Sequence, residues 1–267
     1  MSTETSLPTC YRHPDRETRL SCSSCERPTC VDCVRSAAVG QKCVDCAAPQ
    51  GRATVIRGRD LSPTSGAPVT KAVLVLCAVV FVLGFVDDGL LASVGAQFNE
   101  AVRSGQWYRL ISAAFLHDGA MHRLFNRWAL YAFGPQLERS AGSAAFAGLY
   151  FASALAGGAA FFLLGPTRGI AVGASGAIFG LFGAWLAEAV RSRNTLRGRA
   201  QLNQLLFLLG INAALGLVVP GIAWQAHLGG LIAGFVIVLT WRAVGERRDR
   251  QPLRALVAVA VGALALG

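Results

Sequence analysis

The residues of this sequence best suited to chemistry are a serine and a histidine, Ser175 and His227. Each lies near the start of an apolar stretch long enough to cross a membrane, in the motifs Gly-Ala-Ser-Gly (173–176) and Ala-His-Leu-Gly-Gly (226–230). A polar side chain is costly at such depth and is therefore a candidate for function. Because an imidazole can activate a serine hydroxyl as the nucleophile of acyl transfer, the pair predicts peptide-bond hydrolysis within a bilayer.

Helix packing is the alternative interpretation of the serine. Small residues such as Gly176, Gly180 and Gly183 let helices approach closely whether or not they catalyse. The histidine favours catalysis, since Gly230 and Gly234 follow it on its own helical face. Two glycine-lined helices in contact would bring the hydroxyl within reach of the imidazole, which could accept the serine proton and later donate it to the leaving amine.

Acyl transfer also needs hydrogen-bond donors for the developing oxyanion. A serine at the start of a helix lies beside backbone N–H groups that have no partner within the helix. His122 and Asn126 are four residues apart, share one helix face and can both donate. A polar pair that merely joins two helices is the alternative for these two residues.

Composition divides the chain into a polar N-terminal region and an apolar remainder. Only 15% of the residues are charged and 53% are apolar, and the mean hydropathy is +0.46, whereas soluble domains carry about 25% charge. The sequence therefore predicts an all-α polytopic membrane protein, with spans at about 70–86, 120–138, 143–164, 174–190, 202–220 and 222–241. Residues 253–267 are apolar but short for a span, which leaves a seventh transmembrane helix open.

Arginines set the predicted orientation. Arginine-rich loops mark the cytoplasmic side, and such segments follow the fourth and sixth spans, at 191–200 and 242–254. The N-terminal region is then cytoplasmic, while the segment 87–119, Ser175 and His227 lie near the outer face. The net charge of +10 would also suit a nucleic acid, but its clustering beside the spans favours the membrane, so we expect no nucleic-acid partner.

Eight potential metal ligands lie in the first 46 residues. They form four pairs, each with the two-residue gap that lets both side chains hold one metal: Cys10, His13, Cys22, Cys25, Cys30, Cys33, Cys43 and Cys46. The region has too few apolar residues to fold alone, so two structural zinc ions would supply the folding energy. Disulfides are the alternative, which a reducing cytoplasm disfavours.

The cysteine spacing resembles that of B-box-type zinc fingers, which interleave their two sites. That resemblance implies one ion held by Cys10, His13, Cys30 and Cys33, and a second held by Cys22, Cys25, Cys43 and Cys46. The B-box usually has histidines in its last pair, where this chain has cysteines. We expect this zinc head to bind a protein partner.

The membrane motifs resemble those of rhomboid intramembrane serine proteases. That family carries a Trp and an Arg in its first loop, His-x4-His-x2-Phe-Asn at the second span, Gly-x-Ser-Gly-x3-Gly at the fourth and Ala-His-x2-Gly-x3-Gly at the sixth. The matching residues here are 107–109, 117–126, 173–180 and 226–234. The resemblance covers about residues 70–243 and implies a rhomboid-like six-helix bundle.

The resemblance also implies a mechanism. It implies a Ser175–His227 dyad without a catalytic aspartate, and an oxyanion hole made by the Ser175 backbone N–H, His122 and Asn126. The substrates would be single-span membrane proteins in the lipid bilayer, cleaved near the outer end of the transmembrane helix after lateral movement near the fifth span. No cofactor would take part in the chemistry.

Other positions match the family in supporting roles. Trp107 and Arg109 would anchor the first loop in the outer interface, where such residues also favour the lipid headgroups. Gly173 would help position the loop before the serine. His117 matches a position usually thought structural.

Two arginines depart from the family pattern. Arg123 and Arg127 flank the proposed oxyanion donors, where apolar residues are usual, and lie about 100° around the helix from them. They would either reach the outer surface or line the cavity. Their effect on substrate preference stays open.

The predicted organisation has four regions. These are a zinc head at 1–46, a flexible linker at 47–69, an intramembrane protease domain at 70–243, and a basic loop with the unassigned apolar segment at 244–267. Two other functions stay open: an inactive rhomboid-like protein that binds membrane clients, and an adaptor whose zinc head is anchored by the membrane region. The inactive alternative would be indicated by loss of the serine or histidine, and both are present.

Overall fold

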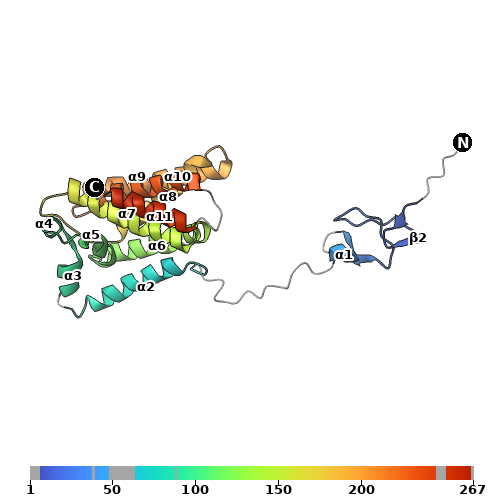
Figure 1. Ribbon diagram of the computed structural model, residues 1–267, viewed down its shortest axis with the longest axis horizontal. Coiled ribbons are helices and arrows are strands. Elements are labelled where there is room, and N and C mark those ends of the chain that lie inside the picture. The colour runs from blue at the N-terminus through green and yellow to red at the C-terminus, as the bar shows by residue number, and fades with distance from the viewer. Residues whose placement is uncertain (1–6, 38–39, 48–63, 88, 245–250, 266–267) are drawn as a thin grey trace. The chain divides into compact units, whose positions relative to one another are not determined.

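The computed structural model describes residues 7–37, 40–47, 64–87, 89–244 and 251–265, which fall into two compact units (Figure 1). The first unit lies within Met1–Ile56 and the second within Arg57–Gly267. Most of the predicted linker, residues 48–63, lies outside the described residues, as do residues 245–250 of the predicted basic loop. Each unit is described by itself.

The N-terminal unit consists of two small antiparallel hairpins and one short helix. Its elements are β1 (Thr9–Cys10) paired with β2 (His13–Glu17), β3 (Val34–Ser36) paired with β4 (Gln41–Cys43), and α1 (Val44–Ala47). The buried apolar cluster contains only Cys10, Cys30 and Cys33, with Tyr11 packed against it. Such a small core needs additional stabilisation, as metal ions would provide.

The second unit is a bundle of long helices (Figure 1). They are α2 (Pro68–Leu83), α6 (Ala120–Ala141), α7 (Ser143–Leu164), α8 (Ser175–Arg191), α9 (Leu196–Val218), α10 (Trp224–Val244) and α11 (Gln251–Leu264). Among the described residues, α7 and α10 have both the length and the hydropathy of a membrane span, and α2 and α11 are shorter apolar helices. Helix α10 packs most extensively against α8 and α7, so these three helices form the centre of the bundle.

Most of the short apolar segment 253–267 lies in a helix, α11. Helix α11 packs along α7 and against α10. The indole Nε1 of Trp241, near the end of α10, donates a hydrogen bond to the backbone oxygen of Arg254 at 2.8 Å. The bundle therefore has a seventh long helix, although at 14 residues it is shorter than the other six.

Short elements connect α2 to α6. They are α3 (Leu90–Gly95), β5 (Gln97–Phe98), α4 (Asn99–Arg103), α5 (Arg109–Ser112) and a 3₁₀ turn, η2 (Ala113–Phe115). Strand β5 pairs with β6 (Ile170–Ala171), in the loop before α8. This pairing joins the loop between α2 and α6 to the loop that precedes Ser175.

Glycines set the distance between the central helices. A β carbon on Gly230 of α10 would collide with the carbonyl of Gly176 on α8, and one on Gly234 would collide with the carbonyl of Gly180. On α7, a β carbon on Gly157 would lie 2.8 Å from a backbone oxygen of α10. The three helices can approach this closely only because these positions lack side chains.

A buried carboxylate fixes the start of α2. Glu138 on α6 is only 1% exposed. It accepts hydrogen bonds from the backbone N–H groups of Val69 and Thr70 at 2.9 and 2.8 Å, and from the hydroxyls of Thr70 and Ser143, each at 2.8 Å. The first N–H groups of a helix have no partner within it and carry partial positive charge, so this carboxylate caps α2 and ties it to α6 and α7.

Candidate active site and metal centres

Ser175 is the first residue of α8 and is half-buried. The loop before it turns at Gly173, whose φ of +124° is a conformation that favours glycine. The Gly173 N–H donates to the Ala113 carbonyl at 2.9 Å, which holds this loop against η2. The first bond of the helix is donated by Ile178 to Ala174, so the earlier N–H groups, that of Ser175 included, have no partner within α8.

His227 lies in the first turn of α10 and faces α8. Its ring stacks on the ring of Phe179, with centroids 4.1 Å apart and planes inclined by 7°. Phe179 is four residues after Ser175 and so lies on the same face of α8. The imidazole is therefore within about one helical turn of the serine, at a spacing set by the glycine contacts between α8 and α10.

His122 packs against the loop that precedes the serine. A β carbon on Gly173 would lie 2.6 Å from Cε1 and 2.8 Å from Nε2 of His122, so the imidazole occupies the space that the glycine leaves. Asn126 lies one turn further along α6, is buried, and donates from Nδ2 to the His122 backbone oxygen at 2.8 Å. The structure thus brings His122 beside the serine loop, with Asn126 next to it on α6.

A small cavity of about 30 Å³ borders Ser175. It is lined by the loop before α8, by the first residues of α8 and by Ala223 and Ala226 at the start of α10. A space of this size can hold a water molecule. A water there would be next to the serine hydroxyl.

The first-loop residues occupy two different environments. Trp107 is 51% exposed, and its ring meets that of Phe162 edge to face at 5.6 Å. Arg109 is buried, and its guanidinium donates to the backbone oxygens of Ala96 and Ser93 at 2.7 and 2.9 Å. Arg109 therefore closes the loop on itself, while Trp107 presents an aromatic surface.

The arginines that depart from the family pattern are also in different environments. Arg127 is exposed. Arg123 is half-buried, lies over the ring of Phe81 and lines a large cavity. Arg123 thus lines a cavity other than the small one beside Ser175, and Arg127 lies at the surface. His117, between this cavity and the serine loop, meets the ring of His122 edge to face at 5.6 Å.

The N-terminal unit holds two candidate metal centres. In each, one ligand atom per residue lies within 4.8 Å of the others, in the groups Cys10, His13, Cys30, Cys33 and Cys22, Cys25, Cys43, Cys46. These are the two groups that the interleaved arrangement predicts. The Nδ1 atom of His13 is 3.9 Å from Cys10 Sγ and 3.4 Å from the Sγ atoms of Cys30 and Cys33. Tetrahedral zinc, with Zn–S near 2.3 Å and Zn–N near 2.0 Å, separates such donors by about 3.6 Å, so the donor spacing fits.

Backbone amides favour the thiolate form in the second centre. The N–H groups of Ser24 and Cys46 point at the Sγ atoms of Cys22 and Cys43, each at 3.4 Å. A hydrogen bond from the backbone at Cys43 is the main cause that lowers the pKa of Cys22 to about 6, and the Cys46 N–H lowers the pKa of Cys43. Since the thiolate is the metal-binding form, these two cysteines of the second centre are suited to a metal ion, whereas neighbouring cysteine side chains raise the pKa of Cys46 in the same group. That this ion is zinc stays a prediction.

One residue of the site was missed by the sequence analysis. Phe179, which stacks on His227, occupies a variable position inside the Gly-x-Ser-Gly-x3-Gly motif. An aromatic residue on an apolar helix face is ordinarily core. Only its four-residue spacing from the serine could have indicated its place.

Comparison with known proteins shows the family of the membrane unit. Residues 104–243 match the rhomboid domain family. The chain is 38% identical over 151 residues to the putative rhomboid protease YdcA of Bacillus subtilis, covering 57% of this chain and 75% of that protein. It is 35% identical over 189 residues to the rhomboid protease GluP of the same organism, covering 69% of this chain and 36% of GluP. A third relative, the mitochondrial RHOMBOID-like protein 6 of Arabidopsis thaliana, is 35% identical over 153 residues, 57% of this chain and 49% of that protein.

The match covers more than half of the chain and includes all four membrane motifs, at 107–109, 117–126, 173–180 and 226–234. The chain spans three quarters of YdcA but about half or less of the other two relatives. The predicted fold class, a helical rhomboid-like bundle preceded by a small cysteine-rich unit, is confirmed. This chain belongs to the rhomboid family, whose members are integral membrane proteins.

Proposed function

We propose that this protein is an intramembrane serine endopeptidase that uses a Ser175–His227 dyad. One observation carries the proposal: the ring of His227 stacks on Phe179, one turn from Ser175 on the same face of α8. A nucleophile and a base on two helices held at glycine contacts are pre-oriented for proton transfer. The relatives named as rhomboid proteases support the same activity.

The proposed reaction has two steps. The Ser175 hydroxyl attacks the carbonyl carbon of the scissile bond while His227 accepts its proton. The oxyanion accepts hydrogen bonds from the Ser175 N–H and from the side chains of His122 and Asn126. As the carbon–nitrogen bond breaks, His227 donates the proton to the leaving amine, and an acyl-serine ester remains.

Water completes the cycle. A water from the small cavity beside Ser175 attacks the ester carbonyl, and His227 accepts the proton of that water. The tetrahedral intermediate collapses with release of the serine oxygen, which takes the proton back from His227. The product is a carboxylic acid, which loses its proton to the solvent, and the dyad returns to its starting state.

The proposed substrates are single-span membrane proteins cleaved near the outer face. Attack requires an extended backbone, so residues that weaken the transmembrane helix at the cleaved bond are favoured. The arginines that follow α8 and α10 support a cytoplasmic position for the loops after these helices. On that topology the cysteine-rich head is cytoplasmic. We propose that its two metal ions are zinc and have a structural role, and that its surface binds a protein partner.

Cleavage in liposomes tests the proposal. A tagged single-span substrate is reconstituted with the wild type, Ser175→Ala, His227→Ala and the control Ser153→Ala, which removes another serine hydroxyl from the same helical core. Ser153 is fully buried, and its hydroxyl has no hydrogen-bond partner among the described residues. We expect cleavage by the wild type and the control only. Cleavage by Ser175→Ala would reject the nucleophile, and no cleavage of several substrates by the wild type would favour an inactive, client-binding protein.

A further inference from the structure

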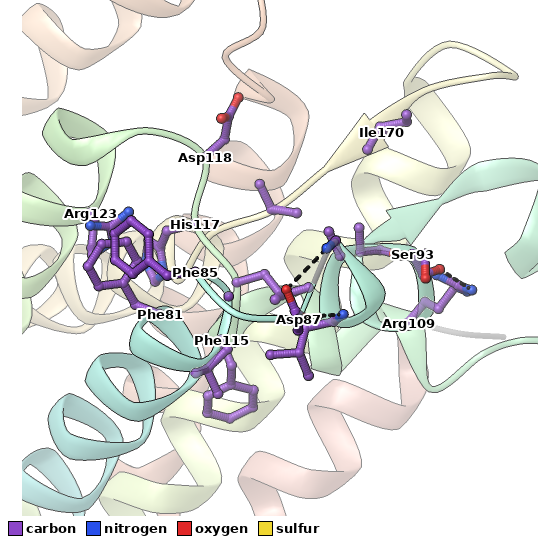
Figure 2. A pocket seen from close by; sticks show the side chains of 18 of the residues that line it. Phe81, Phe85, Asp87, Ser93, Arg109, Phe115, His117, Asp118, Arg123 and Ile170 are labelled. Carbon is purple, nitrogen blue, oxygen red and sulfur yellow. Dashed lines mark hydrogen bonds between the residues drawn. The ribbon is translucent and has the colours of Figure 1, made fainter.

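A large cavity is separate from the cavity beside Ser175. It has a volume of about 620 Å³, within the range of about 300–1,000 Å³ typical of ligand pockets. It lies between the C-terminal end of α2, helix α3 and the loop that leads into α6 (Figure 2). Aromatic side chains, including Phe81, Phe85 and Phe115, form much of its wall. The proposed dyad does not use this space.

Two polar side chains at one end of the cavity lack hydrogen-bond partners. Both ring nitrogens of His117 and the Nε of Arg123 are buried and make no hydrogen bond of normal geometry within the described residues. Leaving a buried donor or acceptor unsatisfied is costly, so such groups usually meet a water or a ligand. Figure 2 shows Arg123 and His117 close to Phe81 and Phe85.

The other charged groups around the cavity are already engaged or directed elsewhere. Asp87 accepts hydrogen bonds from the backbone N–H groups of Gly89 and Leu91. Arg109 donates to backbone oxygens at the opposite end. Asp118 is exposed, and Figure 2 shows its carboxylate away from Arg123. Within the described part of the chain, no carboxylate forms an ion pair with Arg123, so the cavity has an apolar wall and one uncompensated cationic end.

We propose that this cavity binds an anionic membrane lipid, with its phosphate on Arg123 and His117 and an acyl chain along the wall formed by Phe81 and Phe85. An arginine and a neutral imidazole can each donate a hydrogen bond to phosphate oxygens. The aromatic wall suits a hydrocarbon chain. A free fatty acid shares this chemistry, with a carboxylate in place of the phosphate, and the experiment below distinguishes the two.

The site would act on the catalytic centre through two imidazoles. The ring of His117 meets that of His122 at 5.6 Å, and His122 packs against Gly173, two residues before the serine. A phosphate held by His117 would restrict the orientation of His122. This consequence rests on the proposed catalytic function, whereas lipid binding itself does not.

Native mass spectrometry of the full chain, released from micelles after addition of a defined lipid, tests the site without any substrate. The probes are phosphatidylglycerol, phosphatidylcholine with the same chains, and palmitate. Arg123→Gln is compared with Arg127→Gln, which removes the same charge one turn along α6 at an exposed position outside the cavity. Since hydrogen bonds to charged groups are the strong ones, we expect Arg123→Gln to weaken binding of one phosphatidylglycerol by about tenfold to a hundredfold, and Arg127→Gln to leave it unchanged.

A second variant tests the part of the cavity that would hold the acyl chain. Ala92 lines the cavity and is exposed, so Ala92→Phe would occupy chain space without altering the cationic end. Loss of the lipid adduct in this variant too would support the site, and preference for palmitate over phosphatidylglycerol would identify a fatty acid as the occupant. Equal binding of phosphatidylglycerol and phosphatidylcholine, unchanged by Arg123→Gln and Ala92→Phe, would overturn the proposal whether or not the protein proves to be a protease.

Discussion

Replacing Gly230 by alanine should separate the two helices that carry the proposed dyad. The added β carbon would overlap the carbonyl oxygen of Gly176 on α8 and lie 2.8 Å from its carbonyl carbon. Ordinary contacts of a β carbon begin at 3.4 Å, so α8 and α10 would have to move apart by at least about 0.6 Å. The obstacle is backbone, which cannot rotate away as a side chain could.

The size of the effect can be judged against a matched glycine. Gly210 lies on α9, is exposed, and has nothing within 4 Å of an added β carbon. Gly210→Ala should therefore show only the propensity gain, up to about 1 kcal/mol of stability. Gly230→Ala has the same gain, but overpacking of a tight interface costs about 1–3 kcal/mol or more. We expect Gly230→Ala to be less stable than Gly210→Ala by about 2 kcal/mol.

Equilibrium unfolding in mixed micelles would measure this difference, and cleavage by the folded fraction would measure its effect on the site. Because a 1 Å misplacement of reacting groups can cost about a hundredfold in rate, Gly230→Ala should also lose activity per folded molecule. Gly210→Ala should keep wild-type activity. Equal stability and activity of the two variants would refute the idea that the glycine contact positions the catalytic residues.

Three further predictions concern other parts of the chain. Asn126→Ala should lower kcat by about 10²–10³ with a smaller change in KM, measured by cleavage kinetics, because an oxyanion donor acts mainly in the transition state. Glu138→Gln should lower the unfolding free energy by about 2–3 kcal/mol, since an amide cannot accept all the hydrogen bonds at the start of α2, whereas Glu188→Gln, which removes only an ion pair with the exposed Arg191, should be near neutral. In the head, folding lowers the pKa of Cys22 from 9.0 to about 6, so the stabilisation from its thiolate is fully present above pH 9 and is lost as the pH falls through 6. Metal analysis should find about two zinc ions per chain at neutral pH and fewer after chelation, and fewer than about two before chelation would contradict the two-site assignment.

Most of the long helices could be predicted from the sequence because they contain long apolar runs. The span expected at 143–164 coincides with α7, and that at 174–190 differs from α8 by one residue at each end. The fifth span was expected at 202, but α9 begins at Leu196 because the hydroxyl of Thr195 accepts a hydrogen bond from the Gly198 N–H. Hydropathy detects apolar runs, and the first turn of α9 is polar. The expected span therefore begins where the apolar run begins, after the start of the helix.

Contacts between distant segments could not be predicted in the same way. Glu138 caps α2 by binding Val69 and Thr70, from which it is separated by 69 and 68 positions in the sequence. No local pattern marks the partner of a buried carboxylate. The pairing of β5 with β6 involves two residues on each strand, too few for an alternating pattern. The choice between cavity and surface for Arg123 likewise depends on where α2 ends, which only the folded bundle determines.

Covalent labelling of the nucleophile tests the Ser175–His227 dyad most directly. A fluorophosphonate reacts with an activated serine, whose oxygen bonds to phosphorus as fluoride leaves, and peptide mapping then locates the adduct. We expect one adduct on Ser175 in the wild type and in Ser153→Ala, and none in Ser175→Ala or His227→Ala. An adduct on another residue, or undiminished labelling of Ser175 in folded His227→Ala, would contradict it.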